Sequence, residues 1–126
     1  FSINDPHGRI ANFPKIKPIL AAAKQAYNAV YFVSGGDLFS GNPIVDYHPE
    51  KGLPMIDFLN RLEMDISVLG NHEFDYGQEV LAHRITQANF PFICYNVSGG
   101  PDDLAAVHAY KVIEKNGVRI ISLLLK

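Results

Sequence analysis

Three apolar runs, each followed by a cluster of polar side chains, constrain the fold of this chain more than any other feature. The runs are residues 1–3, 29–33 and 65–69, and the clusters that follow them are residues 4–8, 34–37 and 70–75. Short continuous apolar runs are typical of parallel strands that are buried on both faces. In an open α/β sheet such strands end at one common edge, and ligands bind there. The sequence therefore predicts a polar site that is assembled from three separate parts of the chain.

Segments with helical spacing separate the apolar runs. The apolar positions on the predicted helix faces are Ile16, Ile19, Leu20, Ala23 and Tyr27 in the first, Met55, Ile56, Leu59 and Leu62 in the second, and Leu81, Ile85 and Ala88 in the third, which covers 78–89. Residues 38–50 contain glycine, asparagine and two prolines without a regular period, and they predict a long loop. Strands that alternate with helices predict an α/β fold with a mostly parallel sheet and flanking helices.

The C-terminal part of the sequence predicts a β-hairpin. Asn116-Gly117 lies between an alternating segment, 110–114, and an apolar run, 118–125. Asn-Gly between two such segments is a strong hairpin signal. Residues 92–97 predict one more strand and residues 98–103 a loop, so the hairpin would be an antiparallel addition at the end of the sheet. Because a core-like strand ends the sequence and its first residue is Phe1, we expect the chain to be part of a longer protein.

Composition excludes several classes of protein. A chain of 126 residues, 48% hydrophobic and 19% charged, suits one globular domain. The net charge of −2 and the lack of a basic run argue against nucleic acid as a partner. No apolar segment approaches the ~20 residues of a membrane helix, so we expect no membrane partner. Cys94 is the single cysteine and is expected to fill space in the core. We assign no oligomeric state.

The polar clusters carry side chains suited to metal binding and proton transfer. Candidate metal ligands are Asp5, His7, Asp37 and Asn71, and candidate catalytic residues are His72 and Asp75. Oxygen and imidazole donors without thiolates are typical ligands of divalent transition metals. His72 can transfer protons near neutral pH, and Asp75 can hold its ring in one tautomer. A lone Asn-His-Glu would be explained as well by a capped turn, but the three clusters together favour a metal site.

Four other ionisable residues receive no functional role. Glu73 is explained equally well by a salt bridge or a helix cap. His48 lies in the predicted long loop near Asp46, where a solvated side chain is the simpler interpretation. His83 falls on a polar helix face, and His108 precedes the hairpin.

The three clusters resemble the scattered motifs of the calcineurin-like metallophosphoesterases, which are D-x-H, G-D and G-N-H-E/D. The matching residues are Asp5-Pro6-His7, Gly36-Asp37 and Gly70-Asn71-His72-Glu73, in the same order. Gly41-Asn42-Pro43 and the continuation to Asp75 are similar to the 5′-nucleotidase branch, which includes UDP-sugar hydrolases and 2′,3′-cyclic-nucleotide phosphodiesterases. The resemblance implies half of a four-layer αββα domain, with residues 1–126 as the N-terminal part and a nucleotide-binding domain outside this chain.

The resemblance also implies a reaction and a division of roles. Asp5 and His7 would bind one metal ion, Asp37 would bridge two, and Asn71 would bind the second ion and the substrate. His72 would contact the substrate as the catalytic imidazole, with Asp75 orienting it. The implied activity is hydrolysis of nucleotide phosphate esters by in-line attack of a metal-bound hydroxide, with two Mn, Zn, Fe, Co or Ni ions. A small-molecule nucleotide is the implied partner, and the implied location is periplasmic or extracellular.

The family's later ligands, a histidine and a Gly-His-x-His motif, have no match here, because no histidine follows His108. We therefore expect the 126-residue chain to bind at most one divalent ion and to be inactive by itself. Two alternatives stay open. One is a degenerate module that binds a metal or nucleotide without turnover. The other is a different metallophosphoesterase branch, such as a protein phosphatase or a nuclease.

Overall fold

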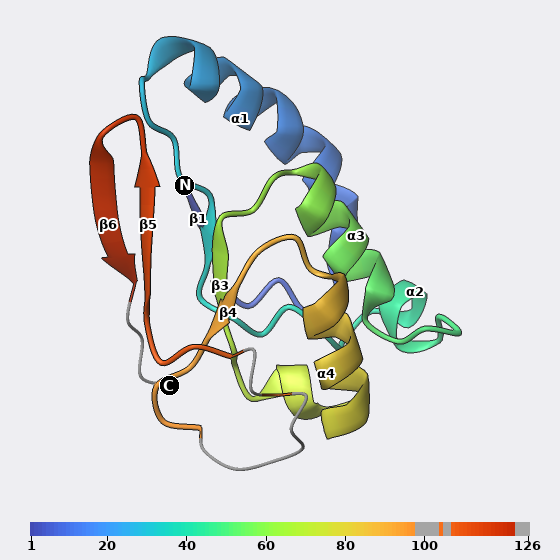
Figure 1. Ribbon diagram of the computed structural model, residues 1–126. Helices are drawn as coiled ribbons and strands as arrows, with labels where there is room; N and C mark the ends of the chain where they lie inside the picture. Colours follow the sequence, from blue (N-terminus) through green and yellow to red (C-terminus); the bar gives the residue numbers. More distant parts are fainter. Residues whose placement is uncertain (98–103, 105–106, 123–126) are drawn as a thin grey trace.

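The computed structural model describes residues 1–97, 104 and 107–122, and its centre is a four-stranded parallel sheet (Figure 1). The strands are β1 (Ser2–Ile3), β2 (Val33–Ser34), β3 (Ile66–Val68) and β4 (Phe92–Ile93). They lie side by side in the order of the sequence, with Val33 paired to both Ser2 and Ile66, and Ser67 paired to Phe92. The predicted parallel sheet is confirmed.

The strands are shorter than the apolar runs that predict them. Just before β2, the Phe32 N–H donates to the Asp65 carboxylate (2.8 Å), and the Asp65 N–H donates to the Phe32 carbonyl (2.8 Å). A side-chain carboxylate therefore replaces the neighbouring strand as the hydrogen-bond acceptor at this position. The regular pairing begins one residue later, at Val33.

Three helices cover one face of the sheet (Figure 1). They are α1 (Phe13–Ala26), α3 (Leu53–Arg61) and α4 (Gln78–Gln87), and a short 3₁₀ turn, η1 (Ile10–Asn12), precedes α1. Each helix connects neighbouring strands, and the order of the described strands never reverses. Because crossovers between parallel strands are right-handed, an unreversed order places all three helices on the same face. Among the described residues, no helix is long and apolar enough to cross a membrane.

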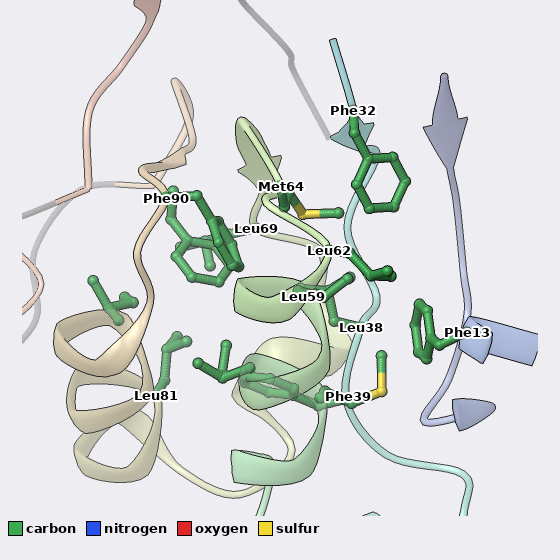
Figure 2. Packing of buried hydrophobic residues seen from close by; sticks show 14 of the residues in the cluster. Phe13, Phe32, Leu38, Phe39, Leu59, Leu62, Met64, Leu69, Leu81 and Phe90 are labelled. Atoms are coloured by element: carbon green, nitrogen blue, oxygen red, sulfur yellow. The ribbon is translucent and has the colours of Figure 1, made fainter. Parts of the chain in front are cut away.

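The core lies between these helices and the sheet (Figure 2). The apolar face predicted for α3 is confirmed, since Met55, Ile56, Leu59 and Leu62 are all buried. The face predicted for α1 is partly wrong: Leu20 and Ala23 are buried, but Ile19 is 54% and Tyr27 68% exposed. Tyr27 follows the last helical turn with an extended backbone, so the helical period no longer orients its side chain.

The long segment 38–50 contains one element that the sequence prediction missed. Residues Pro43–Asp46 form a single helical turn, α2, with the Asn42 side chain accepting a hydrogen bond from the Ile44 N–H (3.0 Å). An asparagine N-cap followed by proline is a common helix start, although four residues are too few to show a period. Val45 is fully buried and anchors this turn to the core.

The predicted hairpin is confirmed as β5 (Lys111–Lys115) and β6 (Val118–Ser122). Asn116 and Gly117 form its turn with φ values of 50° and 79°, as an Asn-Gly turn requires. The hairpin is a separate two-stranded sheet rather than an extension of the parallel one. Ile113 packs against Ile66, Val68 and Ile93, so the hairpin covers the sheet face opposite the helices (Figure 1). The predicted loop at 98–103 and the end of the predicted strand, 123–125, lie outside the described residues.

An ion pair and a hydrogen bond fix the hairpin to the sheet. Lys115 Nζ lies 2.5 Å from Asp65 Oδ1, and the Lys115 N–H donates to the Tyr31 hydroxyl (2.8 Å). Both partners belong to the segments that enter β2 and β3, at the edge opposite the polar clusters. The hairpin is therefore attached away from the candidate site.

Candidate functional site

The candidate residues lie on three loops at the carboxyl edge of the parallel sheet. The loop after β1 runs beside the loop after β2, because the Asp5 N–H donates to the Gly36 carbonyl (3.2 Å) and the His7 N–H donates to the Asp37 carbonyl (3.1 Å). The third loop follows β3 and contains a 3₁₀ turn, η2 (His72–Phe74). The prediction that three distant parts of the chain meet at one edge is confirmed at the level of the backbone.

Two glycines let the second and third loops approach each other. A Cβ atom added to Gly36 would lie 2.8 Å from the Gly70 nitrogen. One added to Gly70 would lie 2.0 Å from Asp37 Oδ1. The Asp37 carboxylate thus occupies the space that any side chain at position 70 would need. This close approach explains why glycine precedes Asp37 and Asn71.

Asp37 is nearly buried at the centre of the site. Its side chain is 3% exposed, and Oδ1 accepts a hydrogen bond from the His72 N–H (3.0 Å). Its backbone is left-handed with φ of 54°, as are those of Asp5 (48°) and His7 (45°). L-residues rarely adopt this conformation, and it concentrates at functional sites. Three of the four predicted metal ligands therefore have an unusual backbone conformation.

Glu73 joins the second and third loops from inside. It is fully buried, and its Oε2 accepts from the Asp37 N–H (2.9 Å) and the Gly70 N–H (2.6 Å), while Oε1 accepts from the Leu38 N–H. Burial raises the pKa of Glu73, and these three hydrogen bonds oppose that rise. The sequence interpretation underrated this residue, because two of its partners precede it by 35 and 36 residues.

His72 and Asp75 form a pair. His72 Nδ1 lies 2.7 Å from Asp75 Oδ2, and both side chains are 39% exposed. The hydrogen bond to Asp75 raises the pKa of His72, and desolvation opposes it. Hydrogen bonds from Ser40 and His72 lower the pKa of Asp75. This arrangement favours a protonated imidazole beside an ionised carboxylate, which suits a general acid.

Sequence reasoning gave no role to Ser40, which contacts this pair, or to Tyr76, which contacts Ser40. Ser40 Oγ donates to Asp75 Oδ2 (2.5 Å), and the Ser40 N–H donates to the Tyr76 hydroxyl (3.0 Å). Burial raises the pKa of Tyr76, so its phenol stays protonated. The left-handed φ of Ser40, 51°, has no marker in the sequence other than the neighbouring Gly41.

The other predicted metal ligands differ in their contacts and in their exposure to solvent. His7 packs edge-on against His72 with ring centroids 4.7 Å apart. Asp5 is exposed and accepts a hydrogen bond from the Asn4 side chain, and Asn71 is exposed beside a hollow that Phe74 and Cys94 also line. Within the described part of the chain, no three histidine, cysteine, aspartate or glutamate side chains are spaced to hold a metal ion. Cys94 is buried, as predicted.

Comparison with known proteins identifies the family. Residues 2–123 match the family model described as calcineurin-like phosphoesterase. The chain belongs to the calcineurin-like phosphoesterase family. The expected resemblance and the expected fold class are thus confirmed, and the three loops correspond to the three motifs that suggested this family.

Several relatives of this calcineurin-like phosphoesterase are named as nucleotide hydrolases. The chain is 35% identical over 112 residues to a 2′,3′-cyclic-nucleotide 2′-phosphodiesterase/3′-nucleotidase of Haemophilus influenzae, and the alignment covers 84% of this chain and 17% of that protein. It is 29% identical over 128 residues to a 5′-nucleotidase of Vibrio vulnificus, covering 93% and 23%. The chain therefore spans about a fifth of the length of these curated relatives.

The fold also matches solved structures. A 5′-nucleotidase precursor from Thermus thermophilus aligns with a TM-score of 0.78 and 26% identity, covering 98% of this chain and 27% of the other. An NAD nucleotidase from Haemophilus influenzae aligns with a TM-score of 0.81 at 21% identity, covering 95% and 24%, and supports the fold alone.

Proposed function

We propose that residues 1–126 are the N-terminal part of the catalytic domain of a metal-dependent nucleotide phosphoesterase. The observation that carries the proposal is the contact at the sheet edge, where Asp37 accepts from the His72 N–H at 3.0 Å and Asp75 lies 2.7 Å from the His72 ring. A nearly buried carboxylate beside an imidazole–carboxylate pair suits phosphoester hydrolysis. The names of the relatives support a nucleotide as substrate.

The chemistry of the site fits divalent metal ions. Asp5, His7, Asp37 and Asn71 offer two carboxylates, an imidazole and an amide oxygen, a donor set that Mn, Zn, Fe, Co and Ni accept. Asp5, His7 and Asp37 lie on two adjoining loops at the sheet edge, although no three of the described aspartate, glutamate, histidine or cysteine side chains are spaced to hold an ion. Two bound ions would supply Lewis acidity to the attacking water and to the phosphoryl oxygens. We propose Asp5 and His7 for one ion, Asp37 for both and Asn71 for the second.

The chain's own residues account for the rest of the proposed chemistry. Asn71 would also contact the phosphate, and the neighbouring His72 would donate a proton to the leaving oxygen. Asp75 holds Nδ1 of that ring, which leaves Nε2 for the substrate. The proposed substrates are 5′-nucleotides, UDP-sugars or cyclic nucleotides. A periplasmic or extracellular location belongs to the same proposal and is supported by the solved relative named as a precursor.

Metal removal tests the proposal. We expect the full-length protein to hydrolyse at least one of these nucleotide classes, to lose more than ~100-fold of kcat on treatment with a chelator, and to regain it with Mn²⁺. Activity that survives complete metal removal, verified by elemental analysis, would contradict the metal-dependent mechanism. Tight metal binding without turnover of any phosphate ester would favour the degenerate binding module instead.

The isolated 126-residue chain gives a second test. Counting donors, one ion would be held by Asp5, His7 and Asp37, and the other by Asp37 and Asn71 alone. We expect calorimetric titration with Mn²⁺ or Zn²⁺ to show at most one weak site per chain, and p-nitrophenyl phosphate to be turned over negligibly. Two tight sites with robust turnover would show that this ligand count is wrong.

A further inference from the structure

We propose that Ser40 and Tyr76 are positioning residues that hold the His72–Asp75 pair in one orientation. The inference rests on the proposed function, because it assigns the pair's orientation a role in proton donation. It goes beyond that function by naming two side chains that the three sequence motifs do not mark and that act through Asp75.

The first step is the mutual contact among the side chains of Ser40, His72 and Asp75. Ser40 Oγ donates to Asp75 Oδ2 at 2.5 Å, and the same oxygen lies 2.7 Å from His72 Nδ1. Ser40 Oγ and His72 Nδ1 are themselves 3.5 Å apart. An ionised carboxylate only accepts hydrogen bonds, so the serine hydroxyl and the ring N–H both donate to it. Two donors on one oxygen fix the rotation of a carboxylate that is 39% exposed and would otherwise turn toward water.

The second step is the support for Ser40 itself. Its backbone is left-handed, with φ of 51°, which a serine does not adopt without support. The Ser40 N–H donates to the Tyr76 hydroxyl (3.0 Å), and the next N–H, of Gly41, donates to Asp46 Oδ2 (3.2 Å). Both peptide groups that flank Ser40 are therefore held, and this directs Oγ at Asp75.

The third step is the direction of the hydrogen bonds at Tyr76. Its hydroxyl has one proton and already accepts from the Ser40 N–H, so that proton goes to Asp46 Oδ1. The Tyr76 ring stacks on the fully buried Phe39, with ring centroids 6.0 Å apart. Phe39 thus holds the Tyr76 ring, and Tyr76 holds Ser40. Ser40 in turn holds Asp75, which accepts the hydrogen bond of the His72 imidazole.

This arrangement predicts a specific kinetic defect. A misoriented imidazole donates its proton poorly, and that matters only when the leaving group needs a proton. A nucleoside 5′-phosphate releases a basic alkoxide, whereas p-nitrophenyl phosphate releases a stable phenolate. Loss of a purely structural hydrogen bond would lower both rates alike.

The test uses Ser40→Ala and Tyr76→Phe in the full-length protein. We expect each variant to lower kcat about tenfold for a nucleoside 5′-monophosphate and less than about threefold for p-nitrophenyl phosphate, with KM and metal content unchanged. In the His72→Asn background neither change should lower kcat further. Tyr27→Phe, at an exposed position at the end of α1, is the matched control and should behave like the unmodified protein.

Two results would overturn the inference: equal losses on both esters, or a full additional loss in the His72→Asn background. A second readout does not depend on activity. With isotope-labelled histidine, the Nδ1 proton of His72 should give a resonance protected from exchange, and Tyr76→Phe should abolish that protection. Unchanged protection would overturn the inference as well. If the unmodified protein hydrolyses neither ester, the proposed function fails, and the His72 resonance alone decides whether Ser40 and Tyr76 position the ring.

Discussion

Replacing His72 with asparagine in the full-length protein is expected to lower kcat by about 10²- to 10⁴-fold while the bound metal stays near its original level. The asparagine cannot donate a proton from the position of the imidazole, but its backbone N–H still reaches Asp37, which accepts it at 3.0 Å. The loop and the proposed metal ligands therefore keep their places. Steady-state kinetics and elemental analysis of the same sample measure the two quantities together.

Asp37→Asn should, unlike the His72 variant, lower the amount of bound metal. The amide oxygen can still accept the His72 N–H, but the negative charge proposed to lie between the two ions is lost, so metal content should fall. His83→Asn is the matched control, since His83 is an exposed histidine on α4. Equal metal loss in the His72 and Asp37 variants would contradict the separation of proton donation from metal binding.

The sequence predicted the positions of the strands, the buried face of α3 and the hairpin turn, because the pattern that marks each of them lies within a few residues. The run at 65–69 marks β3, the spacing of Met55, Ile56 and Leu59 marks the buried face of α3, and Asn116-Gly117 marks the turn. Strand length was predicted less well, because Asp65 supplies a hydrogen bond that periodicity does not reveal.

The same distinction separates the site residues that the sequence predicts from those that it does not. The sequence alone could select six candidates that stand in short motifs directly after strands: Asp5, His7, Asp37, Asn71, His72 and Asp75. The contacts that join Glu73 to Asp37 and Leu38, and Ser40 to Asp75 and Tyr76, span 35 or 36 residues of sequence. Nothing within one sequence ties such partners together, because the contact exists only once the glycines let the two loops meet.

Glu73→Ala should produce the largest loss of stability of any single substitution at this site, about 3–5 kcal/mol. The change removes the acceptor of three buried N–H groups, those of Asp37, Leu38 and Gly70, and leaves a cavity where a fully buried side chain was. Each orphaned donor costs about 1–3 kcal/mol, less where water enters the cavity. Urea unfolding of the full-length protein measures the total, and hydrogen exchange at these three amides locates it.

Glu73→Gln separates the hydrogen bonds from the volume. Glutamine fills nearly the same space but replaces one accepting oxygen with an NH₂ group, which faces a backbone donor and cannot bond to it. We expect a loss of about 1–3 kcal/mol, and faster exchange at Leu38 or at the Asp37 and Gly70 pair, according to which oxygen is replaced. Glu79→Gln, at an exposed position in the first turn of α4, loses only a favourable charge at the helix N-terminus and should change stability by less than about 1 kcal/mol. If Glu73→Gln were as stable as the Glu79 control, the three hydrogen bonds would not hold the second and third loops together. The placement of Asp37 beside His72 would then depend on the packing at Gly36 and Gly70 alone.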